Sequence, residues 1–246
     1  MTDKTTQPER PPTPEEAKAL AVADAKRLLR IERTGALATF DAEHRAPLVT
    51  LVGVASDWDG APLFLMSELA RHTRNLADDA RASLLVTSVG GRGDPLNQPR
   101  LTIGGPVVRH DDPSSRERYV RRNPKAKLYV GFGDFAVRRM RIESVHFNGG
   151  FGRADVLTPQ DLLTPLEGVQ ALIEAEPKLL AWAESLGDEA LARLAGELDA
   201  RRVWKPVGVD ADGLDLSSGG HPARATFAAA ANGPDAWRGQ LENLLR

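Results

Sequence analysis

Six short apolar runs, each bounded by Gly, Asp or Pro, occupy residues 35–152 and restrict this part of the chain to a β fold. Their lengths and their content of β-branched residues are typical of strands, and their close succession indicates an antiparallel barrel or sheet. A DWDG turn at residues 57–60 connects the second run to the third. The runs read GALATF, PLVTLVGVAS, PLFLMS, ASLLVTSV, RLTIGGPVVRH and SVHFNGGFG.

Three helices are expected around these strands. Thr13 precedes a proline and two acidic residues, which is the pattern of a capped helix start, and Gly35 is expected to end this helix. A second helix is expected over residues 68–79, between the third and fourth runs. A third is expected over residues 113–122, where Asp112 precedes a proline as the capping residue.

Beyond residue 157 the pattern changes to helices followed by further short runs. The Thr-Pro pairs at 158–159 and 164–165 are typical of helix starts, and helical segments are expected to 199 with breaks at Pro177 and Gly187. Strands at 203–209, 213–216 and 224–227 and a last helix at about 234–245 complete a second α+β unit. We therefore expect a disordered tail at 1–12, one domain at 13–157 and a smaller one at 158–246.

The composition removes several classes of chemistry. The chain has no cysteine, which excludes disulfides, thiolate metal sites, iron–sulfur clusters and a cysteine nucleophile. Its five histidines are scattered and form no i, i+4 pair, so no metal site is predicted, and no catalytic residue can be assigned. The usual metalloprotease, serine hydrolase, P-loop and dinucleotide-binding motifs are missing as well.

The charges separate along the chain although the net charge is only −2. Residues 71–141 hold 15 Lys and Arg against 7 Asp and Glu, a net +8, whereas residues 155–246 hold 8 against 15, a net −7. One interpretation is that the two regions attract each other, within one chain or across a dimer. The other is that the basic region lines an anion site. The near-neutral total argues against a nucleic-acid partner.

The first residues, MTDKTTQPERPPTPEE, are polar and rich in proline, and they lack the apolar stretch of a signal peptide. No segment reaches the 18 or so continuous apolar residues of a membrane span. We therefore expect a cytoplasmic protein with no membrane partner.

The segment with the strongest functional signal joins the third run to the second helix. Ser67, Arg71, His72, Thr73 and Arg74 gather around the predicted start of that helix. Free backbone N–H groups and the positive end of the helix dipole favour an anion there, and arginine can contact phosphate oxygens in pairs. The alternative is an ordinary amphipathic helix whose leucines face the core while its arginines are solvated.

The stretch over residues 47–86 resembles the FMN-binding split-barrel proteins related to pyridoxamine 5′-phosphate oxidase. The matching pattern, SxLAxHTxNL followed by D.RASLL, lies at residues 67–85, and RLTIGG at 100–105 and GGFGRA at 149–154 match as well. The similarity is to the branch that adds a C-terminal α+β domain, which includes heme-utilisation proteins. It implies an antiparallel split β-barrel with flanking helices, a homodimer, and FMN held at the subunit interface.

The resemblance also implies a set of cofactor-binding residues. Arg71, His72 and Thr73 correspond to the phosphate-binding turn, and Arg100 corresponds to a residue that reaches the flavin. The second and third runs would flank the flavin ring through Val49, Thr50, Leu51, Val52, Met66 and Ser67. The expected function is a flavin-dependent oxidoreductase of an unknown small-molecule substrate, because a bound flavin supplies the redox chemistry that the side chains lack.

The sequence departs from this branch in its C-terminal half. Relatives carry a stretch resembling HMNxDHxDAL, whereas this chain has Trp182 and Gly187 at the histidine positions and no histidine after His221. Two alternatives to the oxidoreductase therefore stand beside it. One is a heme-binding protein, and the other is a non-catalytic regulatory module that has kept the barrel without flavin chemistry.

Overall fold

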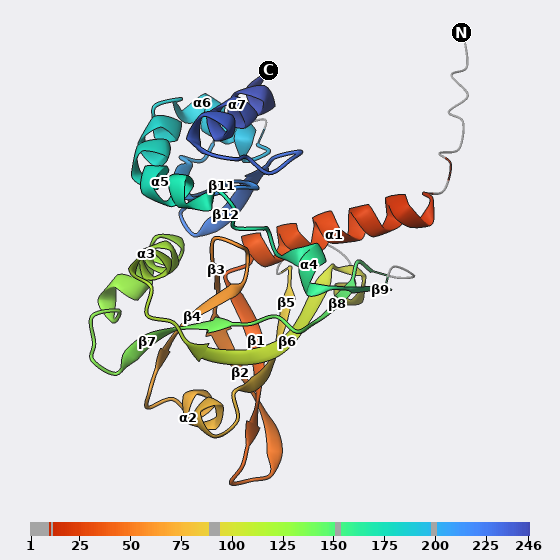
Figure 1. Cartoon of the computed structure of the whole chain (residues 1–246), viewed down its shortest axis with the longest axis vertical. Coiled ribbons are helices and arrows are strands. Elements are labelled where there is room, and N and C mark those ends of the chain that lie inside the picture. The colour runs from red at the N-terminus through yellow and green to blue at the C-terminus, as the bar shows by residue number, and fades with distance from the viewer. Residues whose placement is uncertain (1–9, 11, 89–93, 151–153, 198–200) are drawn as a thin grey trace.

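The computed structural model describes residues 10, 12–88, 94–150, 154–197 and 201–246 and confirms the α+β fold (Figure 1). Most of the tail expected at 1–12, and parts of the glycine-rich stretches at 90–93 and 149–152, lie outside these residues. The helices are α1 (Pro14–Ile31), α2 (Arg71–Asp78), α3 (Pro113–Arg122), α4 (Pro159–Leu162), α5 (Val169–Glu184), α6 (Asp188–Leu194) and α7 (Pro234–Leu245), with 3-10 turns η1 (Pro95–Asn97) and η2 (Pro124–Leu128). The strands are β1 (Thr34–Asp41), β2 (Ala46–Gly53), β3 (Ala55–Ser56), β4 (Pro62–Ser67), β5 (Arg81–Thr87), β6 (Arg100–Arg109), β7 (Phe135–Met140), β8 (Ser144–Asn148), β9 (Ala154–Leu157), β10 (Lys205–Asp210), β11 (Gly213–Ser218) and β12 (His221–Thr226).

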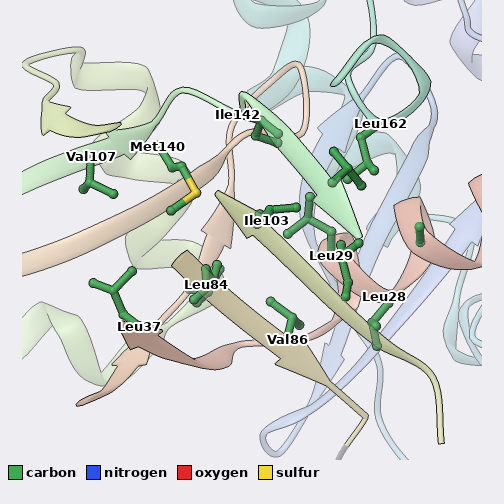
Figure 2. Packing of buried hydrophobic residues seen from close by; sticks show 14 of the residues in the cluster. Leu28, Leu29, Leu37, Leu84, Val86, Ile103, Val107, Met140, Ile142 and Leu162 are labelled. Atoms are coloured by element: carbon green, nitrogen blue, oxygen red, sulfur yellow. The ribbon is translucent and has the colours of Figure 1, made fainter. Parts of the chain in front are cut away.

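The larger sheet is antiparallel and curls into a split barrel. Its strands follow the order β2-β1-β5-β6-β7-β4-β3, and β8 and β9 extend it from β6. One register row places Leu37, Leu84, Ile103 and Val145 side by side, and all four are buried. Figure 2 shows this core, which Leu28 and Leu29 of α1 close at one end. The alternation expected of strands with one buried face is therefore present.

The six strands expected in this region were too few, because the described part of the sheet has nine. The second run divides into β2 and β3, and β7 and β9 were missed. β7 does not read as apolar because Arg138 and Arg139 follow each other in it, and both are neutralised by carboxylates from elsewhere. A strand stabilised by ion pairs leaves no hydrophobic pattern in the sequence.

Helix ends explain most of the remaining differences. Thr13 caps α1 in a capping box as expected, but the helix ends at Ile31 and Gly35 lies in β1. α2 begins at Arg71 and not at residue 68, because the Ser67 hydroxyl accepts the backbone N–H of Leu69 in a turn after β4. Asp112 caps α3 as predicted.

The second unit packs α5, α6 and α7 around a three-stranded sheet, β10-β11-β12. The expected break at Gly187 is confirmed, since this residue precedes α6. The break at Pro177 was wrong, because α5 runs through it, and so was a helix start at the Thr-Pro pair 164–165, because α5 begins after Gly168. No helix among the described residues has both the length and the apolar character needed to cross a membrane.

A buried network of ion pairs joins the two units. Asp210 of β10 accepts hydrogen bonds from Arg30 of α1 at 2.7 Å and from both terminal nitrogens of Arg224. α3 contributes Arg118, which lies 3.0 Å from Glu176 Oε1. The neighbouring Arg122 pairs with Asp215 at 2.7 Å. The basic barrel region and the acidic C-terminal region thus attract each other within one chain, as the first interpretation of the charge separation proposed.

Candidate functional site

The start of α2 is the place where the sequence predicted an anion site. β4 ends at Ser67, a short turn follows, and Ala70 stands at the N-cap position without a side chain that could accept the first N–H groups. No side chain caps the first turn, and the positive end of the helix dipole lies at this point, although the N–H of Thr73 donates to the Ala70 carbonyl at 3.1 Å. An uncapped helix start is the feature on which the predicted anion at residues 67–74 depends.

His72 lies in the first turn of α2 and contacts the barrel. Its Nδ1 is 3.2 Å from Oγ1 of Thr50 on β2, so two of the predicted site residues meet. Burial, together with the positive charge of Arg138, lowers the pKa of His72 below its usual value. Both effects favour the neutral imidazole in the folded chain.

Thr73 follows on the same turn and supplies an orphaned hydroxyl. The residue is 1% exposed, and its Oγ1 has no hydrogen-bond partner among the described residues. Nε of Arg138 is buried and unpartnered as well, although its Nη2 donates to both carboxylate oxygens of Glu68 at 3.0 Å. Buried polar atoms without partners are uncommon in folded proteins, and a bound anion is one way to satisfy them.

Ser67 and Met66 end β4 in different environments. Met66 is buried in the barrel core, whereas the Ser67 hydroxyl donates to Asp134 Oδ2 in the turn before β7. The Ser67 proton is thus already used within the chain, and Asp134 fixes the orientation of the hydroxyl oxygen.

Arg71 points away from this turn toward the β1–β2 hairpin. Its Nε lies 2.9 Å from Asp41, its Nη2 lies 2.6 Å from Glu43, and its Nη2 is 2.8 Å from the ring of His44. Hydrogen bonds from His44 and Arg71 outweigh burial and hold the pKa of Asp41 below its usual range. The hairpin acids and His44 could ligate a metal by distance alone, but the guanidinium already lies among them.

The remaining predicted residues on β2 face opposite sides of the sheet, because side chains alternate along a strand. Val52 is buried, while Val49 and Leu51 are 61% and 78% exposed. Leu51 stands in a register row with Leu85 and Val156, and these two are also exposed. Thr102 and His146 lie between Leu85 and Val156 in this row. Exposed apolar side chains gathered on one face of a sheet are typical of a surface that another chain covers.

Arg100 lies far from α2 within the chain. It pairs with Thr87 at the end of β5, whereas α2 leads into the beginning of that strand at Arg81. Six residues of strand separate the two positions, which is roughly 20 Å. Its Nη1 donates to the Leu96 carbonyl at 2.7 Å. One chain therefore gathers Thr50, Ser67, His72 and Thr73 but not Arg100.

One functional candidate, Arg138, was missed from the sequence; it reaches the start of α2 from β7. Asp134 was considered from the sequence as a substrate contact or a turn anchor, and the structure shows it orienting Ser67 from the turn before β7. The position of Arg138 depends on the pairing of β7 with β4, which could not be read from local sequence.

Comparisons with known proteins place the chain among relatives of this architecture. A family model described as pyridoxamine 5′-phosphate oxidase matches residues 22–149. Among curated proteins, the chain is 31% identical over 144 residues to the non-canonical heme oxygenase HOZ, chloroplastic, of Arabidopsis thaliana. That match covers 56% of this chain and 43% of the relative, so the chain spans less than half the length of that protein.

Two solved structures are similar over most of their lengths. The protein Atu2129 of Agrobacterium tumefaciens, whose function is unknown, is 36% identical with a TM-score of 0.80, and the match covers 94% of this chain and 98% of that one. A heme binding protein of Mycobacterium smegmatis is 26% identical with a TM-score of 0.55, covering 92% and 96%. The C-terminal unit is therefore shared with relatives and is not peculiar to this chain.

Proposed function

The chain belongs to the pyridoxamine 5′-phosphate oxidase family, and we propose that it is an FMN-dependent oxidoreductase acting on a small molecule. The observation that carries this proposal is the uncapped start of α2 with the orphaned hydroxyl of Thr73. A phosphate group would satisfy both features, since it accepts backbone N–H groups at helix starts and hydroxyl protons. The residues present therefore fit the phosphate end of FMN.

In this proposal the side chains bind and orient the cofactor. Thr73 donates its hydroxyl to the phosphate, and His72 becomes protonated as the phosphate approaches, which adds a charge-assisted hydrogen bond. Thr50 keeps the imidazole in position through its 3.2 Å contact. When bound, the flavin would supply electron-transfer chemistry, which the side chains of this cysteine-free chain do not offer.

We further propose that two copies of the chain assemble with their outward apolar rows in contact. The row contains Leu51, Leu85 and Val156, and Val49 lies next to it on β2. Burying such residues stabilises association, and the partner copy would supply the residues that one chain leaves apart, Arg100 included. Light scattering after size exclusion tests this, with Leu51→Glu expected to give a monomer.

The visible spectrum of the purified protein tests the main proposal. Bands of bound flavin, or their appearance on titration with FMN, are the expected result. A colourless protein that does not bind added FMN would contradict the proposal and would favour the regulatory, non-catalytic alternative.

Heme binding is a second candidate, favoured by two relatives whose names state a heme function. His44, His146 and His221 are exposed and accessible to a porphyrin iron. Heme titration should then shift the Soret band, and His146→Ala and His221→Ala identify the ligand. No shift with the wild-type protein would remove this candidate.

A further inference from the structure

A cavity lies where the barrel, α3 and the C-terminal sheet meet. Its volume is about 520 Å³, within the range of roughly 300–1,000 Å³ that small-molecule sites occupy. Gly53 of β2, the η2 turn and the glycines between β11 and β12 form its walls, so both units contribute. Its principal side chains, none of which belongs to the α2 site, are Arg33, Tyr119, Asn123, Lys125, Tyr129 and Ser217.

The side chains that line this pocket carry a positive charge, and the nearest carboxylate along the chain, Glu32, lies outside the lining. No acidic residue lines the cavity among the described residues, and neither Arg33 nor Lys125 forms an ion pair there. Arg33 donates Nη1 to the Arg122 carbonyl at 3.1 Å and leaves its other nitrogens available. The buried arginines of the neighbouring network, in contrast, each pair with an acid. Burial lowers the pKa of Arg33, although the charge of adjacent Glu32 opposes this, so its cation lacks full solvation.

The same pocket has an aromatic wall. Tyr119 is 2% exposed, and burial raises the pKa of its hydroxyl. Tyr129 packs its ring against Phe135 with centroids 4.9 Å apart, which holds the ring at the cavity. The amide of Asn123 is already used, because it donates to the Val54 carbonyl.

We propose that this pocket binds a small aromatic carboxylate. Arg33 and Lys125 contact the carboxylate, and the ring of the ligand lies against Tyr129. Two unpaired cations beside aromatic rings select a planar molecule with one anionic end, because a neutral ligand would leave the cations without partners. The claim that this ligand is the substrate rests on the proposed function. The claim that the pocket binds it does not.

Calorimetric titration of the full chain with 2-naphthoate and with its neutral analogue 2-naphthamide tests the assignment. We expect 2-naphthoate to bind at least about tenfold more tightly. Arg33→Gln and Lys125→Gln should each weaken 2-naphthoate by roughly threefold to tenfold and leave 2-naphthamide unchanged. Lys127→Gln is the matched control, because this exposed lysine lies in the same turn outside the cavity, and it should bind as the wild type does.

Three results would overturn the proposal. Equal affinity for the two naphthalene compounds, or no binding of 2-naphthoate, would show that the cations do not select an anion. Unchanged binding of 2-naphthoate by the folded Lys125→Gln variant would also overturn the proposal. This variant is informative because Lys125 is exposed, so its substitution should not affect folding as that of Arg33 could. Displacement of 2-naphthoate by inorganic phosphate would assign the pocket to phosphate. FMN is titrated separately. A protein that binds 2-naphthoate but not FMN would support the pocket assignment and contradict only the proposed function.

Discussion

The side chain of His72 couples the candidate site to pH. Because burial and Arg138 lower its pKa in the folded chain, the unfolded chain takes up the proton more readily. Above the pKa of the unfolded chain, near 6.5, His72 is neutral in both states and does not reduce the free energy of unfolding. The free energy of unfolding decreases as the pH falls from there toward the lowered pKa of the folded chain. His72→Gln should therefore lose less stability than the wild type between about pH 7.5 and pH 5.5 in urea unfolding. Equal losses would contradict this, and His146→Gln, at an exposed position, is the control.

Substitution of Thr73 tests the effect of its hydroxyl on the free energy of unfolding and on FMN affinity separately. Thr73→Val keeps the shape and removes a buried hydroxyl without a partner, so unfolding free energy should stay the same or rise by about 1 kcal/mol. FMN affinity should fall at the same time, because the phosphate loses a donor. Thr39→Val is the matched control: this buried hydroxyl accepts from Asn75 at 3.0 Å, and its loss should cost about 1–2 kcal/mol. A Thr73→Val protein with unchanged FMN affinity would exclude the hydroxyl from the site.

At the scale of elements, α5 carries a cost that its packing overcomes. Pro177 lies in the middle of this helix and deprives the Ile173 carbonyl of its usual donor. Leu172, Leu179 and Ala183 are buried in the C-terminal core and hold the helix together around the proline. Pro177→Ala should raise the unfolding free energy by about 2 kcal/mol. The gain is reduced because proline also stabilises the folded chain by lowering the conformational entropy of the unfolded chain. Chemical denaturation measures this, and a destabilised variant would show that the proline is required.

Some of the helices and strands could be predicted from the sequence and others could not. Runs with alternating or continuous apolar residues were predicted because burial leaves that pattern, and capped helix starts at Thr13 and Asp112 were predicted because capping is local. β7 was missed because its arginines are satisfied by Glu68, Asp57 and Asp59, which are distant in sequence. Local propensity could not reveal that tertiary packing would carry α5 through a proline.

At the same scale, the candidate site was predicted in part. The turn at 67–73 could be found from its hydroxyls and cations beside a helix start, and the structure places Thr50 against His72 there. The pairing of Arg71 with Asp41 and Glu43 depends on the β1–β2 hairpin, which no local pattern describes. At the two positions where the resemblance implies histidines, Trp182 packs edge-on against Trp237, and Gly187 adopts a positive φ of 87° before α6.

At the scale of the whole molecule, the ion-pair network connects the two units, and we expect them to unfold together. Asp210 is fully buried and counters Arg30 and Arg224, which strongly lowers the pKa of its carboxyl group despite burial. Asp210→Asn should destabilise the chain by about 3 kcal/mol or more, because it leaves buried cations without a counter-charge. Glu143→Gln, which removes an exposed pair with Arg141 at 3.5 Å, should change stability by less than about 1 kcal/mol. Similar effects in the two variants, measured by urea unfolding, would contradict a network that locks the units together.

FMN and riboflavin differ only in the phosphate that we propose binds at the start of α2. The affinities of the full chain for these two flavins, measured by quenching of flavin fluorescence, therefore test the proposed site. We expect FMN to bind at least about 30-fold more tightly, because charge-assisted hydrogen bonds to the phosphate would be lost with riboflavin. Equal affinities, or no binding of either flavin, would contradict the assignment.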